Sequence, residues 1–317
     1  MKNPKITILI ATYNRASLLP NTLQSILAQT YSHWECLIID DHSTDGTEKI
    51  VQDYINKDKR FSYYLKSENY KVGLSGTRNY GLDLAESKKS EFIQFFDDDD
   101  LMHPKKLELQ LKGLLEHPES MFSICGRRNF ENEDEINWED HQQIFQSKLY
   151  SFGEAFLIGK LRLVAQVFLF RAQYLKDQRF DENLRYAEDW EFFSKLFLKE
   201  NPKYEVLDQV LFFRRKHLNS MTEDLDTTGL RASNLNAAVN KVFYFLVDQK
   251  CHTVNSLTYF GRVFLLYHYS SNNLELIKQI SKEDKMFSKL SKRLQMALKI
   301  HYLMRKMILR ILIYNAN

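Results

Sequence analysis

The chain has 317 residues, with 44 Lys and Arg against 41 Asp and Glu, so its formal net charge is only +3. This length is enough for one large domain, or for one domain with an appendage. The three cysteines form no closely spaced pair, which excludes a disulfide framework and a cysteine-based zinc site and is typical of the reducing cytosol. No apolar run approaches membrane-spanning length, and the first residues lead into a strand rather than a signal peptide, so we expect a soluble or peripheral cytoplasmic protein.

Strands and helices alternate through roughly the first 125 residues. Nearly continuous apolar runs at 5–11 and 34–39 predict strands buried on both faces, and further strands are expected at 61–66, 92–96 and 121–125. Apolar residues at helical spacing follow the first four strands, at about 18–27, 50–55, 75–86 and 107–115. This alternation predicts right-handed βαβ units and a mostly parallel central sheet flanked by helices, which is an α/β fold.

The next hundred residues are less regular. The polar stretch 129–146 predicts a long loop, of the kind that often serves as a lid or a binding segment. We expect a helix at 151–158, a strand at 164–170, a helix from Glu188 and a strand at 206–213. On the third of these elements, Glu191 and Lys195 are spaced for an exposed i,i+4 ion pair. Beyond residue 227 the pattern is helical throughout.

Polar residues follow three of the predicted strands at the point where each strand ends: 12–15, 40–43 and the four consecutive aspartates 97–100. Because ligands bind beyond the carboxyl ends of parallel strands, we expect all three segments to meet at one rim. Adjacent carboxylates suit a hard, oxygen-preferring cation such as Mg²⁺ or Mn²⁺, although a solvated acidic loop that caps the next helix explains them equally well. Neither a dinucleotide signature nor a phosphate loop of the Gly-Lys-Ser/Thr type follows the first strand.

Five short motifs stand in a fixed order along roughly residues 4–220. They are Ile8-Leu9-Ile10-Ala11-Thr12-Tyr13-Asn14-Arg15, Ile38-Ile39-Asp40-Asp41-His42-Ser43-Thr44-Asp45, Gly73-x-x-x-x-Arg78-Asn79, Phe96-Asp97-Asp98-Asp99-Asp100 and Glu188-Asp189-Trp190. Each motif alone is a weak signal. Together they resemble the family-2 glycosyltransferases, which have the GT-A nucleotide-sugar-binding fold.

The resemblance implies an inverting transfer of a sugar from a nucleotide-diphosphate donor, most often a UDP-sugar, to an acceptor hydroxyl. In this reading Asp189 is the general base and Glu188 its acidic companion. Asp97 and Asp99 are the two carboxylates of an Asp-x-Asp motif that binds Mn²⁺ or Mg²⁺, with Asp99 the more direct metal ligand. The positions that would contact the donor are Ala11, Thr12, Tyr13, Arg15, Asp41, Arg78, Asp97 and Asp98.

Three positions depart from the family pattern or extend it. The family commonly has Gly where His42 stands, and since His adopts a left-handed backbone less readily, we expect a looser turn there. Asp98 adds a charge at the variable middle position of the acidic motif. His217, in a basic segment that in some relatives closes over the diphosphate, is a further candidate metal ligand.

The domain division that we expect is a glycosyltransferase domain at 1–225, with a nucleotide-binding half at 1–125 and an acceptor-binding half at 126–225, followed by a helical region at 226–317. Eight Lys and Arg and no acid lie between Lys285 and the C-terminus, so the rest of the chain is net acidic and nucleic acid is not an expected partner. The basic helix predicted there suits either an anionic membrane surface or packing within the protein or an oligomer.

The expected acceptor is a glycan or a lipid-linked saccharide. Two enzymatic alternatives are disfavoured by motif position: a sugar-phosphate nucleotidyltransferase usually has a Gly-rich loop after its first strand, and a haloacid-dehalogenase-like phosphatase has its Asp-x-Asp there. A nucleotide-sugar-binding accessory protein without turnover stays open, although it would leave Asp189 without a purpose.

Overall fold

The structure, a computed structural model, describes residues 3–144, 149–216 and 230–266 and a few positions between 273 and 280. The chain divides into two compact units, Met1–Ala238 and Val239–Asn317. His217 and the basic helix expected beyond Lys285 lie outside the described residues. None of the described helices is both long enough and apolar enough to cross a membrane.

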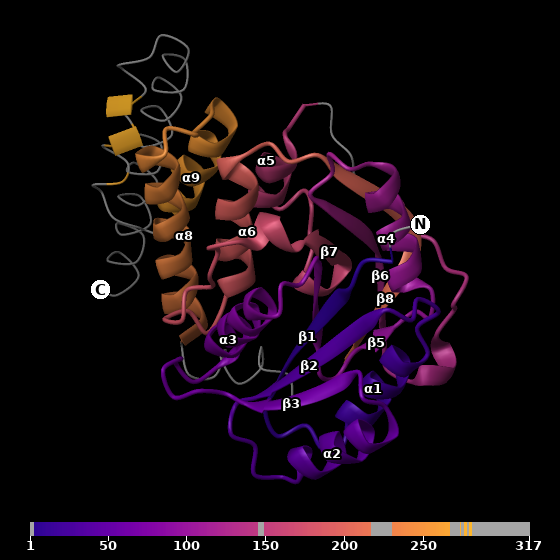
Figure 1. The fold of residues 1–317 in the computed structure, drawn as a ribbon. Helices are drawn as coiled ribbons and strands as arrows, with labels where there is room; N and C mark the ends of the chain where they lie inside the picture. Colours follow the sequence, from indigo (N-terminus) through magenta and orange to yellow (C-terminus); the bar gives the residue numbers. More distant parts are fainter. Residues whose placement is uncertain are drawn as a thin grey trace, which may run out of the picture. The chain divides into compact units, whose positions relative to one another are not determined.

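One eight-stranded sheet runs through the first unit, in the order β3-β2-β1-β4-β7-β6-β8-β5. Its first half is parallel and regular (Figure 1). β1 (Ile6–Thr12) pairs with β2 (Trp34–Asp40) on one side and with β4 (Phe92–Asp97) on the other, and β3 (Phe61–Leu65) extends the sheet beyond β2. β1, β2 and β4 are almost wholly buried, as their continuous apolar runs predict, whereas the edge strand β3 is partly exposed.

The second half of the sheet is mixed. β7 (Phe168–Arg171) runs antiparallel to both of its neighbours, β4 and β6 (Phe122–Phe130). β8 (Tyr204–Arg215) is parallel to β6, with register shifts at Cys125/Gly126 and Gly126/Arg127, and it pairs antiparallel with the short β5 (Leu101–Met102). The α/β fold expected from the sequence is confirmed, but the sequence does not indicate β5 or the antiparallel pairs.

α1 (Leu19–Leu27), α2 (Thr47–Lys57) and α3 (Leu74–Ser87) connect the parallel strands of the first half, and α4 (Lys106–Glu116) connects β5 to β6. α3 packs on β1 and β2 so closely that a Cβ added at Gly81 would come within 3.1 Å of Ile39 Cδ1. The apolar faces of these helices are buried, as the helical spacing predicts.

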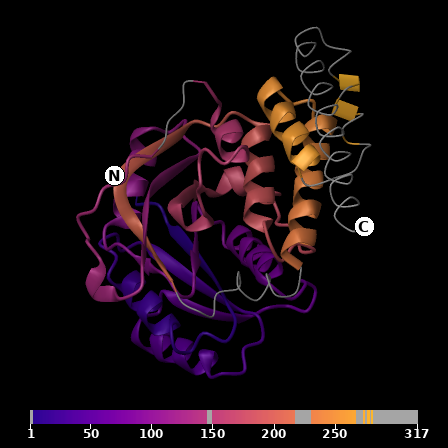
Figure 2. The same cartoon turned by 180° about the vertical axis from the view of Figure 1, so that it is seen from behind.

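The remaining helices of the described residues lie between β6 and β8 or follow the sheet. They are η1 (Glu133–Glu135), α5 (Phe152–Leu157), η2 (Ala165–Val167), η3 (Ala172–Leu175), α6 (Glu188–Lys199), α8 (Leu230–Asp248) and α9 (Val254–Leu266). Figure 2 shows the same elements from behind. α5 begins with a capping box, in which Ser151 and Glu154 exchange side-chain and backbone hydrogen bonds.

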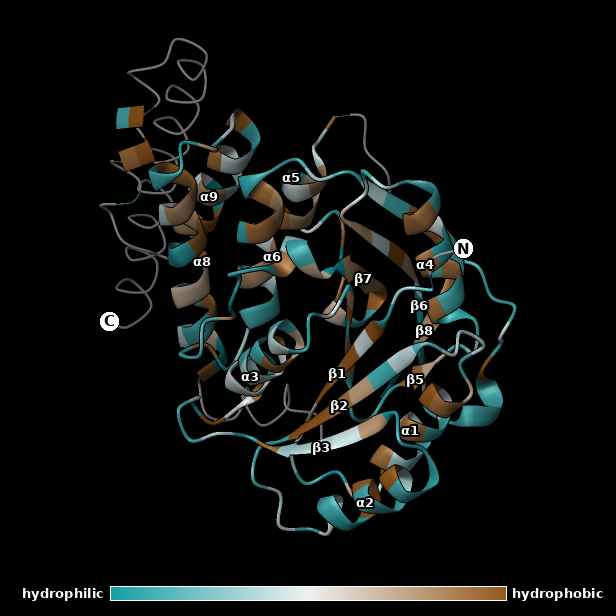
Figure 3. Ribbon diagram, viewed as in Figure 1, coloured by the Kyte–Doolittle hydropathy of each residue, from teal (hydrophilic) through white to brown (hydrophobic). Residues whose placement is uncertain are grey.

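An aromatic cluster fills the core of the second half. Phe122 on β6 contacts the rings of Phe152, Phe168, Phe170, Phe197 and Tyr204 at centroid separations of 5.1 to 5.6 Å. Figure 3 shows the apolar colour concentrated on the inner strands and on the inward faces of the helices. The aromatic runs of α6 are therefore core residues, since the packing of their rings takes up their surface.

One sequence expectation about α6 is wrong. Glu191 and Lys195 do form an i,i+4 ion pair of 2.5 Å, but the Glu191 side chain is fully buried rather than exposed. The burial raises the pKa of Glu191, while Lys195 opposes the shift. Periodicity marks which residues share a helix face, but it does not show that α6 is covered on more than its apolar face.

Candidate active site

The loops that follow β1 and β2 are fastened to each other. Asn14 and His42 both have left-handed backbones, with φ of 52° and 64°. The Asn14 amide donates to Ser43 Oγ at 2.8 Å, and the Thr44 amide donates to Asn14 Oδ1 at 2.8 Å. The expectation of a looser turn at His42 is therefore wrong, because these bonds hold His42 in the tight conformation that Gly would adopt more readily.

Asp41 lies in a buried pocket at the end of β2. Its Oδ2 accepts a hydrogen bond from the Gly73 amide at 2.6 Å, and its Oδ1 is 2.9 Å from Lys66 Nζ. Lys66 is itself buried and also donates to the carbonyls of Tyr70 and Lys71, both at 3.0 Å. Lys66 thus fixes both the Asp41 carboxylate and the loop around it. Sequence reasoning missed this lysine, because nothing distinguishes it locally from other polar residues after a strand.

The four consecutive aspartates divide into two pairs by their exposure. Asp98 and Asp100 are buried, at 8% and 2% exposure, whereas Asp97 and Asp99 are partly accessible. β4 ends at Asp97, and Asp98 and Asp99 form the turn that follows it. Only two of the four carboxylates therefore face the open side, and a simple solvated loop is excluded.

The two buried aspartates have defined partners. Asp98 Oδ1 is 3.4 Å from Arg15 Nε, and burial together with the Asp99 charge raises the pKa of Asp98 to about 8. Asp100 Oδ1 accepts a hydrogen bond from the Arg215 amide at 2.9 Å, while Arg215 Nε donates to the Asp99 carbonyl at 2.9 Å. The end of β8 thereby holds the acidic segment in place.

Arg78 links the acidic segment to the first turn of α6. Its guanidinium is 4% exposed and makes ion pairs with both Asp97, at 3.1 Å, and Asp189. Burial raises the pKa of Asp189, while Arg78 favours its ionised form. Burial, followed by the Asp189 charge, raises the pKa of Glu188 to about 7. Residues separated by more than a hundred positions thus meet in one cluster.

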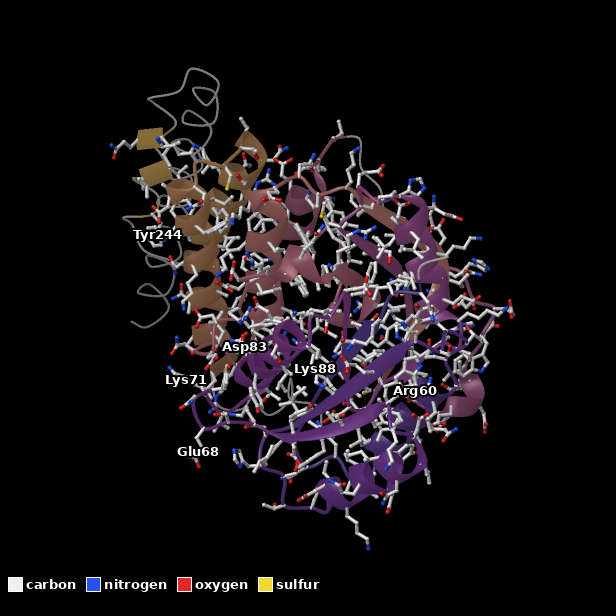
Figure 4. The ribbon with its side chains drawn as sticks, in the orientation of Figure 1. Arg60, Glu68, Lys71, Asp83, Lys88 and Tyr244 are labelled. Atoms are coloured by element: carbon white, nitrogen blue, oxygen red, sulfur yellow. The ribbon has the colours of Figure 1, made fainter. Side chains whose placement is uncertain are left out.

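α3, which carries Arg78, is tied along its length to the segment that precedes α6. At its start, the Lys71 amide donates to Glu182 Oε2 at 2.8 Å, and near its end Asp83 pairs with Arg179. Figure 4 labels both Lys71 and Asp83. Between them, the side-chain Nδ2 of Asn79 donates to the Phe180 carbonyl at 2.9 Å. The guanidinium of Arg78 therefore stands on a helix that is fastened to the segment leading into α6.

The other predicted donor positions surround this cluster. Ala11 is the register partner of Asp97, and Thr12 is the partner of Asp40. Thr12 is buried, whereas the Tyr13 ring is 56% exposed and free of the sheet. The structure thus brings the predicted site residues of β1, β2, β4, α3 and α6 to one rim, with only His217 outside the described residues.

The carboxylate oxygens at this rim are ligands that suit a hard divalent cation. Asp97 and Asp99 present carboxylate oxygens on the partly open side, and Mg²⁺ and Mn²⁺ prefer such ligands while keeping positions for phosphate oxygens. Arg78 pairs with Asp97 through Oδ1. Within the described part of the chain, no group of three or more His, Cys, Asp or Glu is already arranged around a common point.

Comparison with known proteins first defines the class of fold. The structure of S. aureus TarS 1-349 in complex with UDP-GlcNAc superposes with a TM-score of 0.66 at 21% identity, covering 93% of this chain and 87% of TarS. A mannosyltransferase from Pyrobaculum calidifontis, solved with GDP-Man and Mn²⁺, gives a TM-score of 0.55 at 18% identity, covering 95% of this chain and 86% of the other. The fold is therefore that of the GT-A glycosyltransferases.

Sequence comparison then gives the family. Glycosyl transferase family 2 matches residues 7–175, more than half of the chain, and the chain belongs to this family. It is 31% identical over 180 residues to the Campylobacter jejuni GalNAc(5)-diNAcBac-PP-undecaprenol beta-1,3-glucosyltransferase, covering 56% of this chain and 55% of that protein. It is 35% identical over 123 residues to the putative teichuronic acid biosynthesis glycosyltransferase TuaG of Bacillus subtilis, covering 39% and 46%. The chain thus spans about half the length of these relatives.

Proposed function

We propose that this protein is an inverting, metal-assisted glycosyltransferase that moves a sugar from a UDP-sugar to a hydroxyl of a glycan or lipid-linked glycan. The observation that carries the proposal is the double ion pair of Arg78, which joins the metal-type carboxylate Asp97 to the base-type carboxylate Asp189. Such a reaction needs one carboxylate at the donor diphosphate and another at the acceptor hydroxyl. Family membership, the similar structure solved with bound UDP-GlcNAc, and the relative named as a glucosyltransferase of an undecaprenol-linked glycan support the substrate classes.

Donor binding is assigned to the ends of β1 and β2. Asp41, fixed by Lys66 and the Gly73 amide, would accept a hydrogen bond from the nucleotide base through a remaining lone pair. The exposed ring of Tyr13 offers a face on which the base can stack, with Ala11, Thr12 and Arg15 beside it. Asp98 acts through Arg15, with which it pairs.

Asp97 and Asp99 would hold Mg²⁺ or Mn²⁺, and a bound divalent ion stabilises the negative charge that develops on the departing diphosphate. Asp189 takes the proton from the acceptor oxygen as that oxygen attacks the anomeric carbon from the face opposite the diphosphate, which inverts the configuration. Arg78 keeps Asp189 ionised, and burial strengthens it as a base. Glu188 is the acidic companion in the same turn.

The proposal also assigns a role to each part of the chain and a location to the protein. Residues 1–225 would carry transfer, with donor binding at 1–125 and acceptor binding at 126–225. A lipid-linked acceptor would place the protein at the cytoplasmic face of a membrane, in peripheral contact.

A thermal-shift panel of UDP, GDP and their sugars, with and without Mn²⁺, tests the proposal. We expect UDP and a UDP-sugar to raise the melting temperature, with a larger rise when Mn²⁺ is present, because a ligand that binds only the folded state stabilises it. Asp41→Asn should reduce the shift, while Asp53→Asn, at an exposed position of α2, should leave it unchanged. The absence of a shift with every nucleotide would refute the proposal.

A further inference from the structure

Three arginines that follow the acidic segment in the chain are not paired with a carboxylate of the described residues. They are Arg127 on β6, Arg214 on β8 and Arg162 in the segment between α5 and η2. Within the described part of the chain, none of the three has an ion pair. Arg162 and Arg214 are exposed, and Arg127 is partly buried.

Strand register places two of these side chains on one face of the sheet. Arg127 is the partner of Phe212, and Asn129 is the partner of Arg214. Because side chains alternate along a strand, Arg127 and Asn129 share a face, and so Arg214 lies on that face as well. The intervening Arg128 turns to the opposite face, where its guanidinium pairs with Asp140.

The third arginine is related to this pair through its charge. Burial lowers the pKa of Arg127, and the neighbouring charges of Arg214 and Arg162 lower it further. The acid that opposes this shift is Asp100, which is 2% exposed and already accepts a hydrogen bond from the Arg215 amide. The positive charges of Arg162 and Arg214 thus both act on Arg127, and among the described residues Asp100 is the acid that opposes them. Like charges collected in this way cost free energy unless an anion offsets them.

The position of this cluster separates it from the donor residues. Those residues stand on β1, β2 and β4, whereas β6 and β8 lie beyond β7 in the sheet. Asp99 and Asp100 connect the two areas, because Arg215 of β8 binds both residues. A group bound by the arginines would therefore approach the acidic segment from the side opposite Asp41.

We propose that Arg127, Arg162 and Arg214 form a second anion site that binds a phosphate group of the acceptor. Guanidinium groups match phosphate oxygens with paired hydrogen bonds, and several converging on one point favour a dianion over a neutral sugar. This inference rests on the proposed function and narrows its acceptor to one that carries phosphate near the accepting hydroxyl. The diphosphate of the sugar donor is also an anion that these arginines could bind. The test therefore has to distinguish acceptor phosphate from donor diphosphate.

The test titrates phenyl phosphate into protein saturated with UDP and Mg²⁺, and compares the wild type with the double variant Arg162→Gln/Arg214→Gln. Both positions are exposed, so the fold should persist, which circular dichroism checks. We expect the double variant to bind phenyl phosphate at least about tenfold more weakly, because it loses two charge-assisted contacts. Arg128→Gln, on the same strand but the opposite face, should change the affinity by less than about twofold.

The outcomes separate this inference from the proposed function. Equal affinity for phenyl phosphate in the wild type and the double variant overturns the second site. A parallel loss of UDP affinity in the double variant also overturns it, since the arginines would then belong to the donor diphosphate. If UDP does not bind the wild type at all, the proposed function fails, and the same comparison made without nucleotide still decides whether the arginines bind phosphate.

Discussion

The two halves of the sheet reach the same rim by different means. In the half built from β1 to β4, uninterrupted parallel pairing places each strand end beside the next, so the predicted ligand-binding residues follow directly from strand position. In the half built from β5 to β8, register shifts, antiparallel pairs and 3₁₀ turns interrupt the pattern. There, long-range contacts position the functional groups. The first half is consequently regular and can be predicted from the sequence, while the second contributes the proposed base and the proposed arginine site through tertiary packing.

Asp189→Asn removes the proposed base, which the second half contributes. We expect transfer or donor hydrolysis to fall by about 10²–10⁴-fold, the usual value of general base catalysis, while UDP affinity stays within about twofold. Steady-state assays of UDP release, with isothermal titration for binding, measure the two effects. Glu200→Gln, just after the end of the same helix, is the control. Retained turnover in Asp189→Asn would move the base to another residue or favour a binding protein without turnover.

Lys106→Met tests the polar network under the second half. Lys106 is fully buried and donates to Gln94 Oε1 at 2.6 Å and to Gln110, and Gln94 and Gln110 in turn donate to the carbonyls of η2 at 3.0 Å. Burial lowers the pKa of Lys106 from 10.5 to about 8. At pH values between these two pKa values, Lys106 is protonated in the unfolded chain but mostly neutral in the folded one. The free energy of unfolding should therefore rise with pH over this interval, by up to about 3 kcal/mol in total.

Urea titrations at several pH values between 7.5 and 10 measure that rise as the difference between wild type and variant. Lys106→Met should lack it, whereas Lys112→Met, at a position with 68% side-chain exposure, should keep it. A rise of the same size in Lys106→Met would show that the lysine does not lose its proton on burial.

Arg78→Met breaks the connection between the two halves. The variant leaves Asp97 and Asp189 without their common partner, and we expect the free energy of unfolding to drop by about 2 kcal/mol. This is less than for a fully buried pair, since Asp97 and Asp189 are 35% and 26% exposed. Arg179→Met removes the more exposed ion pairs with Asp83 and Glu86 of α3, and it should lower the free energy of unfolding by less than about 1 kcal/mol. Similar losses in both variants would contradict a special role for the Arg78 bridge.

His42→Gly makes the smallest change and concerns the regular half. His42 already holds a left-handed backbone, so Gly at this position should relieve backbone strain in the folded state. The greater freedom of Gly in the unfolded chain offsets part of this effect, and we expect the free energy of unfolding to rise by about 0.5 kcal/mol. Gly46→Ala, at φ of 91°, should instead lose about 1 kcal/mol. Chemical denaturation resolves the opposite signs, and destabilisation by His42→Gly would mean that the imidazole makes a contact of its own.

Local sequence determined the parallel half of the fold and the identity of most rim residues. Apolar runs at β1, β2 and β4 end in polar residues, and the geometry of parallel strands then forces Thr12, Asp41 and Asp97 to one edge. Tertiary structure alone decided which groups are paired and which stay open. Lys66 reaches Asp41, Arg78 joins Asp97 to Asp189, and Glu191 is buried despite its polar spacing, since each depends on segments that pack together only in the folded chain. Periodicity and motif order describe neighbours along the chain, while burial and ion pairing are set by neighbours in space.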